Sequence, residues 1–181
     1  MKLGTYVEMV NFVDDTKAAG EYYQKLGLKP VADNVYTDGR YHLRIEKGDG
    51  VTPTVRYYGG DLDALKSSGL DIKDGKLSSP EGVTIEVRAD APPLALPHDD
   101  VTVAPDTTRL GKFGELSVFV NDLEVEGAFW EKCGYAVLGQ KYTDPMPWGI
   151  WNDGMFLIGI HQYGMTEPFS ITHFDPNMKD K

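Results

Sequence analysis

The sequence predicts an α+β protein built from a repeated unit of one strand, one helix and several further strands. The first observation is a duplication, because residues 12–28 (FVDDTKAAGEYYQKLGL) return 107 positions later as FVNDLEVEGAFWEKCGY at 119–135. The second is that both predicted helices have matching flanking residues, with an aspartate before each helix and a glycine after it. The third is a proline-rich linker at 91–111, which can continue neither a helix nor a central strand.

The first copy occupies residues 1–90 and contains two predicted helices among six predicted strands. Asp38-Gly39 is a turn signal that joins two of these strands into a hairpin. Alternating apolar residues and turn residues between them define the remaining elements. The predicted strands are 4–13, 31–37, 41–47, 53–58, 71–77 and 83–88, and the predicted helices are 15–26 and 61–68.

The second copy, residues 112–181, repeats only part of this order. A helix is predicted at 122–133, and strands are predicted at 113–120, 136–143, 148–151, 155–163 and 169–174. Aligning TVRYY (54–58) with SITHF (170–174) leaves about 25 residues without an equivalent, so the second unit looks truncated. Either the chain is a fragment of a longer protein, which we favour, or another chain completes the second sheet. The uncharged strand at 169–174 would be an exposed sheet edge through which a homodimer can form.

Composition excludes several classes of function. The net charge is −10 and the sequence pI is about 4.8, which argues against a nucleic-acid partner because phosphate-binding surfaces need clustered lysine and arginine. The apolar runs are too short to span a bilayer, so we expect no membrane partner. The single cysteine, Cys133, cannot form an intrachain disulfide, and a cytoplasmic location is expected.

Several segments together resemble one known family. The helix endings YYQKLGL and FWEKCGY, the segment YGGDLDALKSSGL and the closing SSPEGVTIEV, in this order, are similar to the vicinal oxygen chelate superfamily. That superfamily includes glyoxalase I, extradiol dioxygenases and bleomycin-resistance proteins. The resemblance implies paired βαβββ modules that form curled mixed β-sheets, with the helices outside and a concave ligand cleft.

The resemblance also implies where a divalent metal would bind, and the sequence departs from that pattern. Family enzymes take a ligand from the first strand of a unit, a histidine from the strand before the second helix, and a glutamate from the last strand. Both histidine positions carry hydroxyls, which are poor ligands for zinc, iron or nickel, whereas a site of carboxylates alone suits magnesium or manganese. We therefore expect neither a metal nor another cofactor. The matching positions are Glu8, Thr54 and Glu86 in unit one and Glu115 and Ser170 in unit two, with Glu46 and His161 at an additional ligand position of glyoxalase-like members.

Strand alternation in unit one sends polar side chains to the face that its helix does not cover. In YHLRIE the residues Tyr41, Leu43 and Ile45 form the apolar set, so the residues between them point the other way. TVRYY and VTIEVR bring further charged residues to the same face. A solvated face with cross-strand ion pairs explains this pattern as well as a binding site does. The proposed ligand contacts in unit one are His42, Arg44, Arg56 and Glu86.

Unit two carries a more apolar set on the corresponding face. Aromatic rings with a few polar groups are typical of small-molecule sites, and Gly159 would leave room for a ligand. Core packing is the alternative for each tryptophan, and a hydrogen-bonded structural role is the alternative for His161. The proposed ligand contacts in unit two are Glu115, Phe119, Trp148, Trp151, His161 and Tyr163.

These observations favour a small-molecule-binding protein of the glyoxalase and bleomycin-resistance type without a catalytic metal. The alternative is a divalent-metal-dependent lyase, isomerase or dioxygenase of the same superfamily, so the sequence leaves open whether the protein is an enzyme. A third class is a structural or regulatory interaction domain, because the incomplete second unit has a sheet edge to cover.

Overall fold

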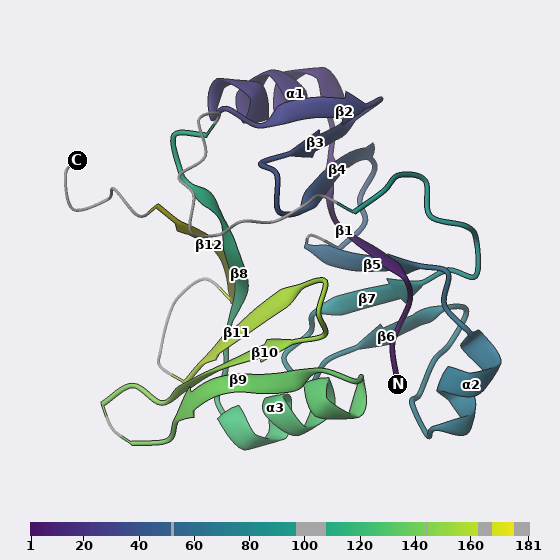
Figure 1. The fold of residues 1–181 in the computed structure, drawn as a ribbon, viewed down its shortest axis with the longest axis vertical. Helices are drawn as coiled ribbons and strands as arrows, with labels where there is room; N and C mark the ends of the chain where they lie inside the picture. Colours follow the sequence, from purple (N-terminus) through teal and green to yellow (C-terminus); the bar gives the residue numbers. More distant parts are fainter. Residues whose placement is uncertain (52, 97–107, 144, 163–167, 176–181) are drawn as a thin grey trace.

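The described residues form two mixed β-sheets with three helices (Figure 1). A computed structural model describes residues 1–51, 53–96, 108–143, 145–162 and 168–175. One sheet has seven strands and lies within residues 6–87, and the other has five strands and lies within residues 112–174. The α+β prediction of repeated βαβββ modules is thereby confirmed.

The seven-stranded sheet contains two modules that meet at its centre. Its strand order is β2-β3-β4-β1-β5-β7-β6, with β1 parallel to β4 and antiparallel to β5. Helix α1 packs on β3 and β4. The elements are β1 (Tyr6–Val13), α1 (Thr16–Lys25), β2 (Lys29–Ala32), β3 (Val35–Thr37), β4 (His42–Lys47), β5 (Thr54–Tyr58), α2 (Leu62–Ser67), β6 (Lys76–Ser78) and β7 (Thr84–Val87).

The five-stranded sheet repeats the first module and adds one strand. Its order is β12-β8-β11-β10-β9, with β8 parallel to β11 and antiparallel to β12, as β1 is to β4 and β5. Among the described residues β12 is an edge strand, and the homodimer through this edge stays a prediction. The elements are β8 (Lys112–Phe119), α3 (Leu123–Lys132), β9 (Ala136–Lys141), β10 (Trp148–Asn152), β11 (Leu157–His161) and β12 (Phe169–Phe174).

The two long helices begin and end as their capping residues require. The Asp15 side chain accepts a hydrogen bond from the backbone of Ala18, and Asp122 accepts bonds from two backbone N–H groups at the start of α3. Gly27 and Gly134 then adopt φ of 98° and 94°, a left-handed conformation that terminates each helix at low steric cost. The duplication in sequence is therefore a duplication of local structure.

One predicted strand is divided in the structure. We predicted a continuous strand at 31–37, but β2 and β3 are separate strands of a tight hairpin. Asn34 lies in the turn with φ of 56°, a conformation that asparagine tolerates better than most residues. An Asp-Asn pair inside an apolar segment was the available signal for this turn.

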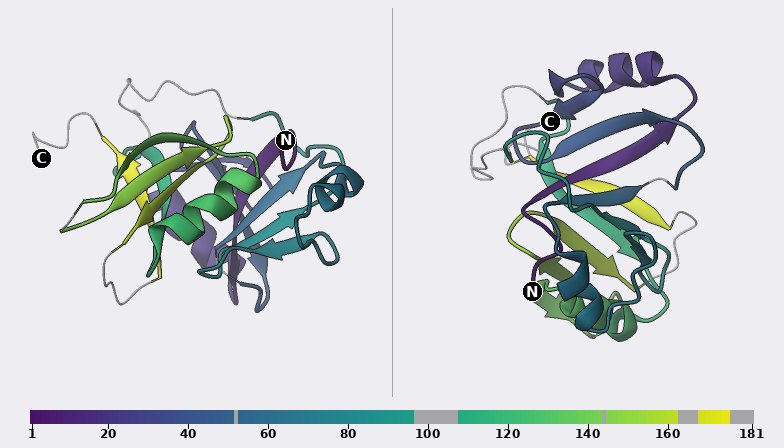
Figure 2. Two further views of the ribbon diagram at one scale, coloured as in Figure 1. Left: turned by 90° about the horizontal axis from the view of Figure 1, so that it is seen from below. Right: turned by 90° about the vertical axis from the view of Figure 1, so that its right-hand side faces the viewer.

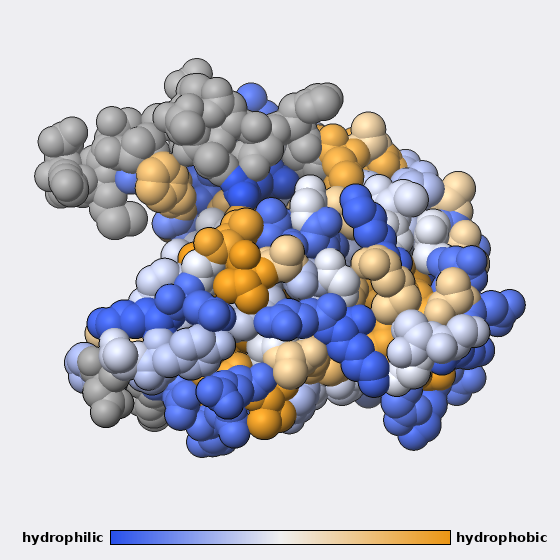
Figure 3. All heavy atoms as spheres, turned by 60° about the horizontal axis from the view of Figure 1, so that its bottom comes forward, coloured by the Kyte–Doolittle hydropathy of each residue, from blue (hydrophilic) through white to orange (hydrophobic). Residues whose placement is uncertain are grey.

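A single hydrophobic core joins the two sheets. The ring of Phe113 in β8 lies 4.5 Å from that of Tyr41, which precedes β4, and 5.0 Å from that of Phe156, which precedes β11. Figure 2 shows the sheets side by side, with α1 and α3 at opposite ends of the right-hand view. In a space-filling view from below, apolar side chains reach the surface in separate patches, one of them at the inner end of an indentation on the left (Figure 3). None of the described helices is long and apolar enough to cross a membrane.

Candidate functional site

Each sheet has a face that points away from the helices of its own modules, which we call the helix-free face. In the seven-stranded sheet, strand alternation buries Leu43, Ile45 and Ile85 on the helix side and sends the residues between them to the helix-free face. β1, β4, β5 and β7 are neighbours, so their polar side chains meet there in one row. The row contains Glu8, His42, Arg44, Glu46, Arg56 and Glu86.

Arg56 lies at the centre of this row and holds three carboxylates. Its Nη1 and Nη2 atoms donate to Glu46 Oε1 and Oε2 at 2.6 and 3.0 Å, and its Nε donates to Glu86 Oε2 at 2.6 Å. Nη1 also lies 3.6 Å from Glu8 Oε1. Although burial alone would lower the pKa of Arg56, the hydrogen bonds to Glu46 and Glu86 outweigh it and raise that pKa. The guanidinium is therefore a permanent cation at this position.

Glu8 is fully buried, and its hydrogen-bonding capacity is used within the protein. Arg44 Nε donates to Glu8 Oε1 at 2.6 Å, and the Tyr58 hydroxyl donates to the same oxygen at 2.9 Å. The Tyr6 hydroxyl lies 3.4 Å from Glu8 Oε2 and 2.6 Å from His42 Nδ1. Burial lowers the pKa of His42, which favours its neutral form. Unit one thus presents a network of cross-strand ion pairs, in which the Arg44 and Glu46 side chains are 19% and 33% exposed.

The metal site that the fold family implies does not fit these residues. Glu8 and Glu86 both face the Arg56 guanidinium, which stands directly opposite Glu8 across β1 and β5. The Thr54 hydroxyl, at the expected histidine position, donates instead to the carbonyl of Val51 at 2.7 Å. Within the described residues no three His, Cys, Asp or Glu side chains are arranged to hold a metal ion.

The helix-free face of the five-stranded sheet has a different centre. Glu115 in β8 is the counterpart of Glu8, and the residue opposite it in β12 is Thr172 instead of an arginine. Glu115 Oε1 lies 2.8 Å from His161 Nε2 and accepts a hydrogen bond from the Ser117 hydroxyl at 2.9 Å. The Glu115 and His161 side chains are 10% and 23% exposed, so this pair is open to solvent, unlike Glu8.

Gly159 explains how the Glu115 carboxylate fits this position. The register of β11 on β8 makes Gly159 the counterpart of Arg44, and His161 the counterpart of Glu46. A Cβ atom on Gly159 would lie 2.2 Å from the Glu115 carboxylate, a separation that real side chains do not reach. The absence of a side chain therefore lets Glu115 lie flat on β11 and reach His161.

The proposed aromatic contacts of unit two separate into two groups. Trp148 pairs directly with His161 across β10 and β11 and is half-buried, and the Phe119 ring lies 5.8 Å from the His161 ring. Trp151 is instead fully buried on the opposite face, beneath α3, where Gly127 makes room for its ring. Trp151 therefore does not reach the helix-free face, because residues three apart in a strand point to opposite sides. Tyr163 lies outside the described residues.

No family model and no curated protein sequence matches this chain. Among solved structures, a catechol 2,3-dioxygenase is similar with a TM-score of 0.55 and 16% identity, over 94% of this chain and 70% of the other. BphC, a halotolerant catechol dioxygenase, gives 0.52 and 14%, over 88% and 65%. The Y257F variant of homoprotocatechuate 2,3-dioxygenase from B. fuscum gives 0.54 and 11%, over 88% and 52%.

These similarities define the fold class of the protein. The chain has the βαβββ module fold of the vicinal oxygen chelate superfamily, as the sequence motifs predicted. It spans 65% of the BphC chain and about half of the homoprotocatechuate dioxygenase chain. A shared fold does not carry an activity with it, so function has to be argued from the residues described above.

Proposed function

We propose that this protein binds a small, partly aromatic organic molecule, without a catalytic metal, on the helix-free face of the five-stranded sheet. The observation that supports this most is the contrast between the two helix-free faces. The carboxylates of the first face pair with arginines, whereas Glu115 of the second contacts His161 and Ser117 and lies beside half-buried aromatic rings. Among the described residues, the second face therefore combines a carboxylate that no arginine contacts with aromatic surface for a ligand.

The chemistry of this second face suits a flat ligand that carries a hydroxyl or amine. Trp148 and Phe119 would supply contact area for a ring, as aromatic side chains commonly do in small-molecule sites. The Glu115 carboxylate accepts hydrogen bonds, so it would fix the orientation of a donor on the ligand. The first face then serves as a rigid scaffold, since Glu8, Glu46 and Glu86 are balanced in charge by Arg44, Arg56 and Arg88, which pairs with Glu86 at 2.8 Å.

Tryptophan fluorescence can test the position of the site. Trp130 in α3 and Trp151 beneath α3 are fully buried, so only Trp148 should report a ligand on the helix-free face. In a screen of small aromatic compounds and oxo-acids, Trp148→Phe should abolish the fluorescence response and weaken binding roughly thirtyfold, the cost of a lost aromatic anchor. Trp151→Phe is the matched control and should leave affinity unchanged. Binding that survives Trp148→Phe and His161→Ala but is lost on Arg44→Ala would place the site in unit one instead.

Metal analysis tests the proposal that the protein has no catalytic metal. Protein purified without chelator and then dialysed should contain no stoichiometric zinc, iron, nickel or manganese. The reason is that Arg56 already neutralises the carboxylates that a metal would need. A stoichiometric metal that disappears in Glu8→Ala or Glu86→Ala would overturn the proposal and favour the metal-dependent lyase, isomerase or dioxygenase.

A further inference from the structure

The duplicated halves of the protein can be compared position by position, and one position differs in a way that leaves a hole. Leu28 and Tyr135 are equivalent, because each follows the glycine that ends its helix and each donates its backbone N–H to a carbonyl five residues earlier. Asp38 and Asp153 occupy equivalent turns, since each side chain accepts from the backbone N–H groups two and three residues later. Arg56 and Thr172 pair with the equivalent residues Glu8 and Glu115, so Tyr57 and His173 each follow an equivalent position, although a register shift after Thr172 pairs His173 with Phe113.

One set of these positions, Tyr57 from the first unit with Tyr135 and Asp153 from the second, forms a closed cluster. The Tyr135 ring lies 5.0 Å from the Trp130 ring, and the Tyr135 hydroxyl is hydrogen-bonded to the Tyr57 hydroxyl. The Tyr57 hydroxyl also donates to Asp153 Oδ2 at 2.7 Å. All four of these residues are buried. A phenol ring from Tyr135 therefore fills the space, and its hydroxyl takes part in a hydrogen-bonded chain.

Of the second set of positions, Leu28 from the first unit and His173 from the second line a cavity of about 290 Å³, whereas Asp38 accepts a hydrogen bond from the backbone of Phe113. Leu28 supplies neither the ring nor the hydroxyl that Tyr135 supplies, and His173 takes the place of Tyr57. The volume is close to the lower end of the range of small-molecule pockets, about 300 Å³. The lining includes Tyr22, Tyr23, Leu28, Tyr41, Ile171 and His173.

One residue that lines the cavity, His173, has a buried polar atom that lacks a partner. His173 Nε2 is buried and has no hydrogen-bond partner among the described residues. The His173 ring bonds to the backbone of Ile171 through its other nitrogen, Nδ1, which donates to the carbonyl. Burial lowers the pKa of His173, so Nε2 carries a lone pair rather than a proton. A buried acceptor of this kind calls for a donor from outside the chain.

We propose that this cavity is a second binding site, which takes a small phenol-like molecule whose ring occupies the space that Tyr135 fills in the closed cluster. The ligand hydroxyl donates to His173 Nε2, as a tyrosine hydroxyl bonds within the closed cluster. Tyr22, Tyr23 and Tyr41 surround the ring. The site lies on the helix side of β12, so it is distinct from the proposed site around Glu115 and His161.

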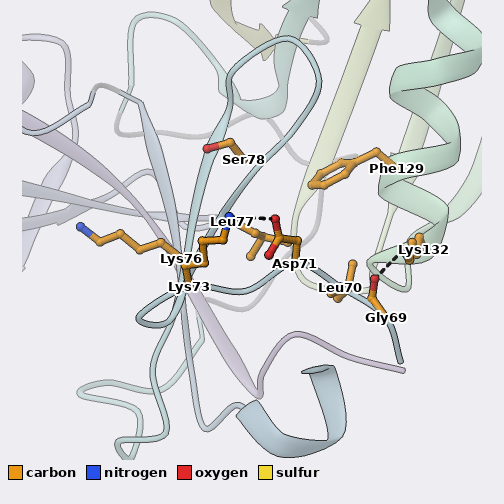
Figure 4. Close-up of a pocket in the computed structure, with 9 residues that line it drawn as sticks. All are labelled: Gly69, Leu70, Asp71, Lys73, Lys76, Leu77, Ser78, Phe129 and Lys132. Carbon is orange, nitrogen blue, oxygen red and sulfur yellow. Dashed lines mark hydrogen bonds and ion pairs between the residues drawn. The ribbon is translucent and has the colours of Figure 1, made fainter. Parts of the chain in front are cut away.

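The hollow beside α3 offers no comparable anchor. It has a volume of about 520 Å³ and lies between α3 and the segment 69–78, where Phe129 takes the position that Tyr22 holds on α1 (Figure 4). Its polar groups pair with one another, since Lys132 Nζ donates to the carbonyl of Gly69 at 2.6 Å and Lys73 lies 3.2 Å from Asp71. An unpartnered buried acceptor distinguishes the cavity at His173.

Calorimetric titration with 4-methylphenol, the side chain of tyrosine as a free molecule, tests the proposal. A ligand of this size should bind with a dissociation constant on the order of 1 mM or lower. Toluene has the same ring without the hydroxyl and should bind about tenfold more weakly, the usual effect of one hydrogen bond. In His173→Phe the two compounds should bind equally. Equal affinities in the wild type, or no heat from 4-methylphenol at about ten times the expected dissociation constant, would overturn the proposal.

Filling the cavity from within gives an independent test. Leu28→Tyr introduces the residue of the equivalent position, Tyr135, and should weaken 4-methylphenol binding more than tenfold, while circular dichroism confirms a folded protein. Leu28→Met is the matched control that keeps the cavity and should keep the binding. Trp148→Phe should also keep it, so failure here and failure of the site at Glu115 are distinguishable. Unchanged binding in a folded Leu28→Tyr protein would place 4-methylphenol elsewhere.

Discussion

Replacing Arg56 by methionine is expected to lower the free energy of unfolding by about 3–5 kcal/mol. The substitution keeps an unbranched apolar stem but removes the cation that contacts Glu8, Glu46 and Glu86. Glu8 has no exposed surface, so it cannot regain water when its partner is lost. For a chain of this length the melting temperature should fall by roughly 10 °C, measured by calorimetry at pH 7.

The pH dependence of the stability loss in Arg56→Met provides a check on this expectation. The hydrogen bond from Arg56 lowers the pKa of Glu46, and those from Arg56 and Arg88 outweigh burial to lower the pKa of Glu86. Stabilisation from such carboxylates is present above their unfolded pKa, about 4.3, and is lost as pH falls through the lower folded value. The difference between wild type and Arg56→Met should therefore shrink below about pH 4.

The exposed ion pair Lys73–Asp71 supplies the matched control. Its side chains are 81% and 82% exposed, so Lys73→Met should change stability by less than about 0.5 kcal/mol. Equal losses from Lys73→Met and Arg56→Met, or a loss from Arg56→Met that persists undiminished at pH 3, would contradict a stabilising role for the buried network.

Strand alternation was sufficient to predict which side chains share a face. It assigned His42, Arg44 and Glu46 to one side and Tyr41, Leu43 and Ile45 to the other; Leu43 and Ile45 are buried and Arg44 and Glu46 are partly exposed, while His42 is buried by its contacts on the other face. Alternation does not indicate which charges pair, because that depends on the register between strands distant in sequence. Placing Arg56 opposite Glu8 required the pairing of β1 with β5, which no local pattern encodes.

The sequence was less informative about Trp151 and about the cavity at His173. Aromatic content suggested that both tryptophans of PMPWGIW contact a ligand, although their spacing of three puts them on opposite faces. A glycine within the predicted helix was the overlooked signal, since Gly127 makes room for the buried Trp151 ring. Comparing Leu28 with Tyr135 would likewise have marked a missing ring, but the unpartnered nitrogen of His173 depends on tertiary contacts.

Replacing Leu116 by aspartate is expected to remove most of the stability of the five-stranded sheet. Leu116 lies at the centre of β8 with no exposed surface, between Ile158 in β11 and Ile171 in β12. An unpaired carboxylate there would cost about 4 kcal/mol or more, a large part of the roughly 5–15 kcal/mol that stabilises a typical domain.

The same chemical change at Leu138, which is 62% exposed in β9, provides the control. Leu138→Asp should shift the melting temperature by no more than about 2 °C, because its carboxylate stays hydrated. Leu116→Asp should shift it by roughly 10 °C or produce a chain that exchanges its backbone amides as an unfolded protein does. If both variants melt like the wild type, Leu116 does not face the core. Because neighbouring residues of a strand point to opposite faces, Glu115 and Ser117 would then not lie on the helix-free face either.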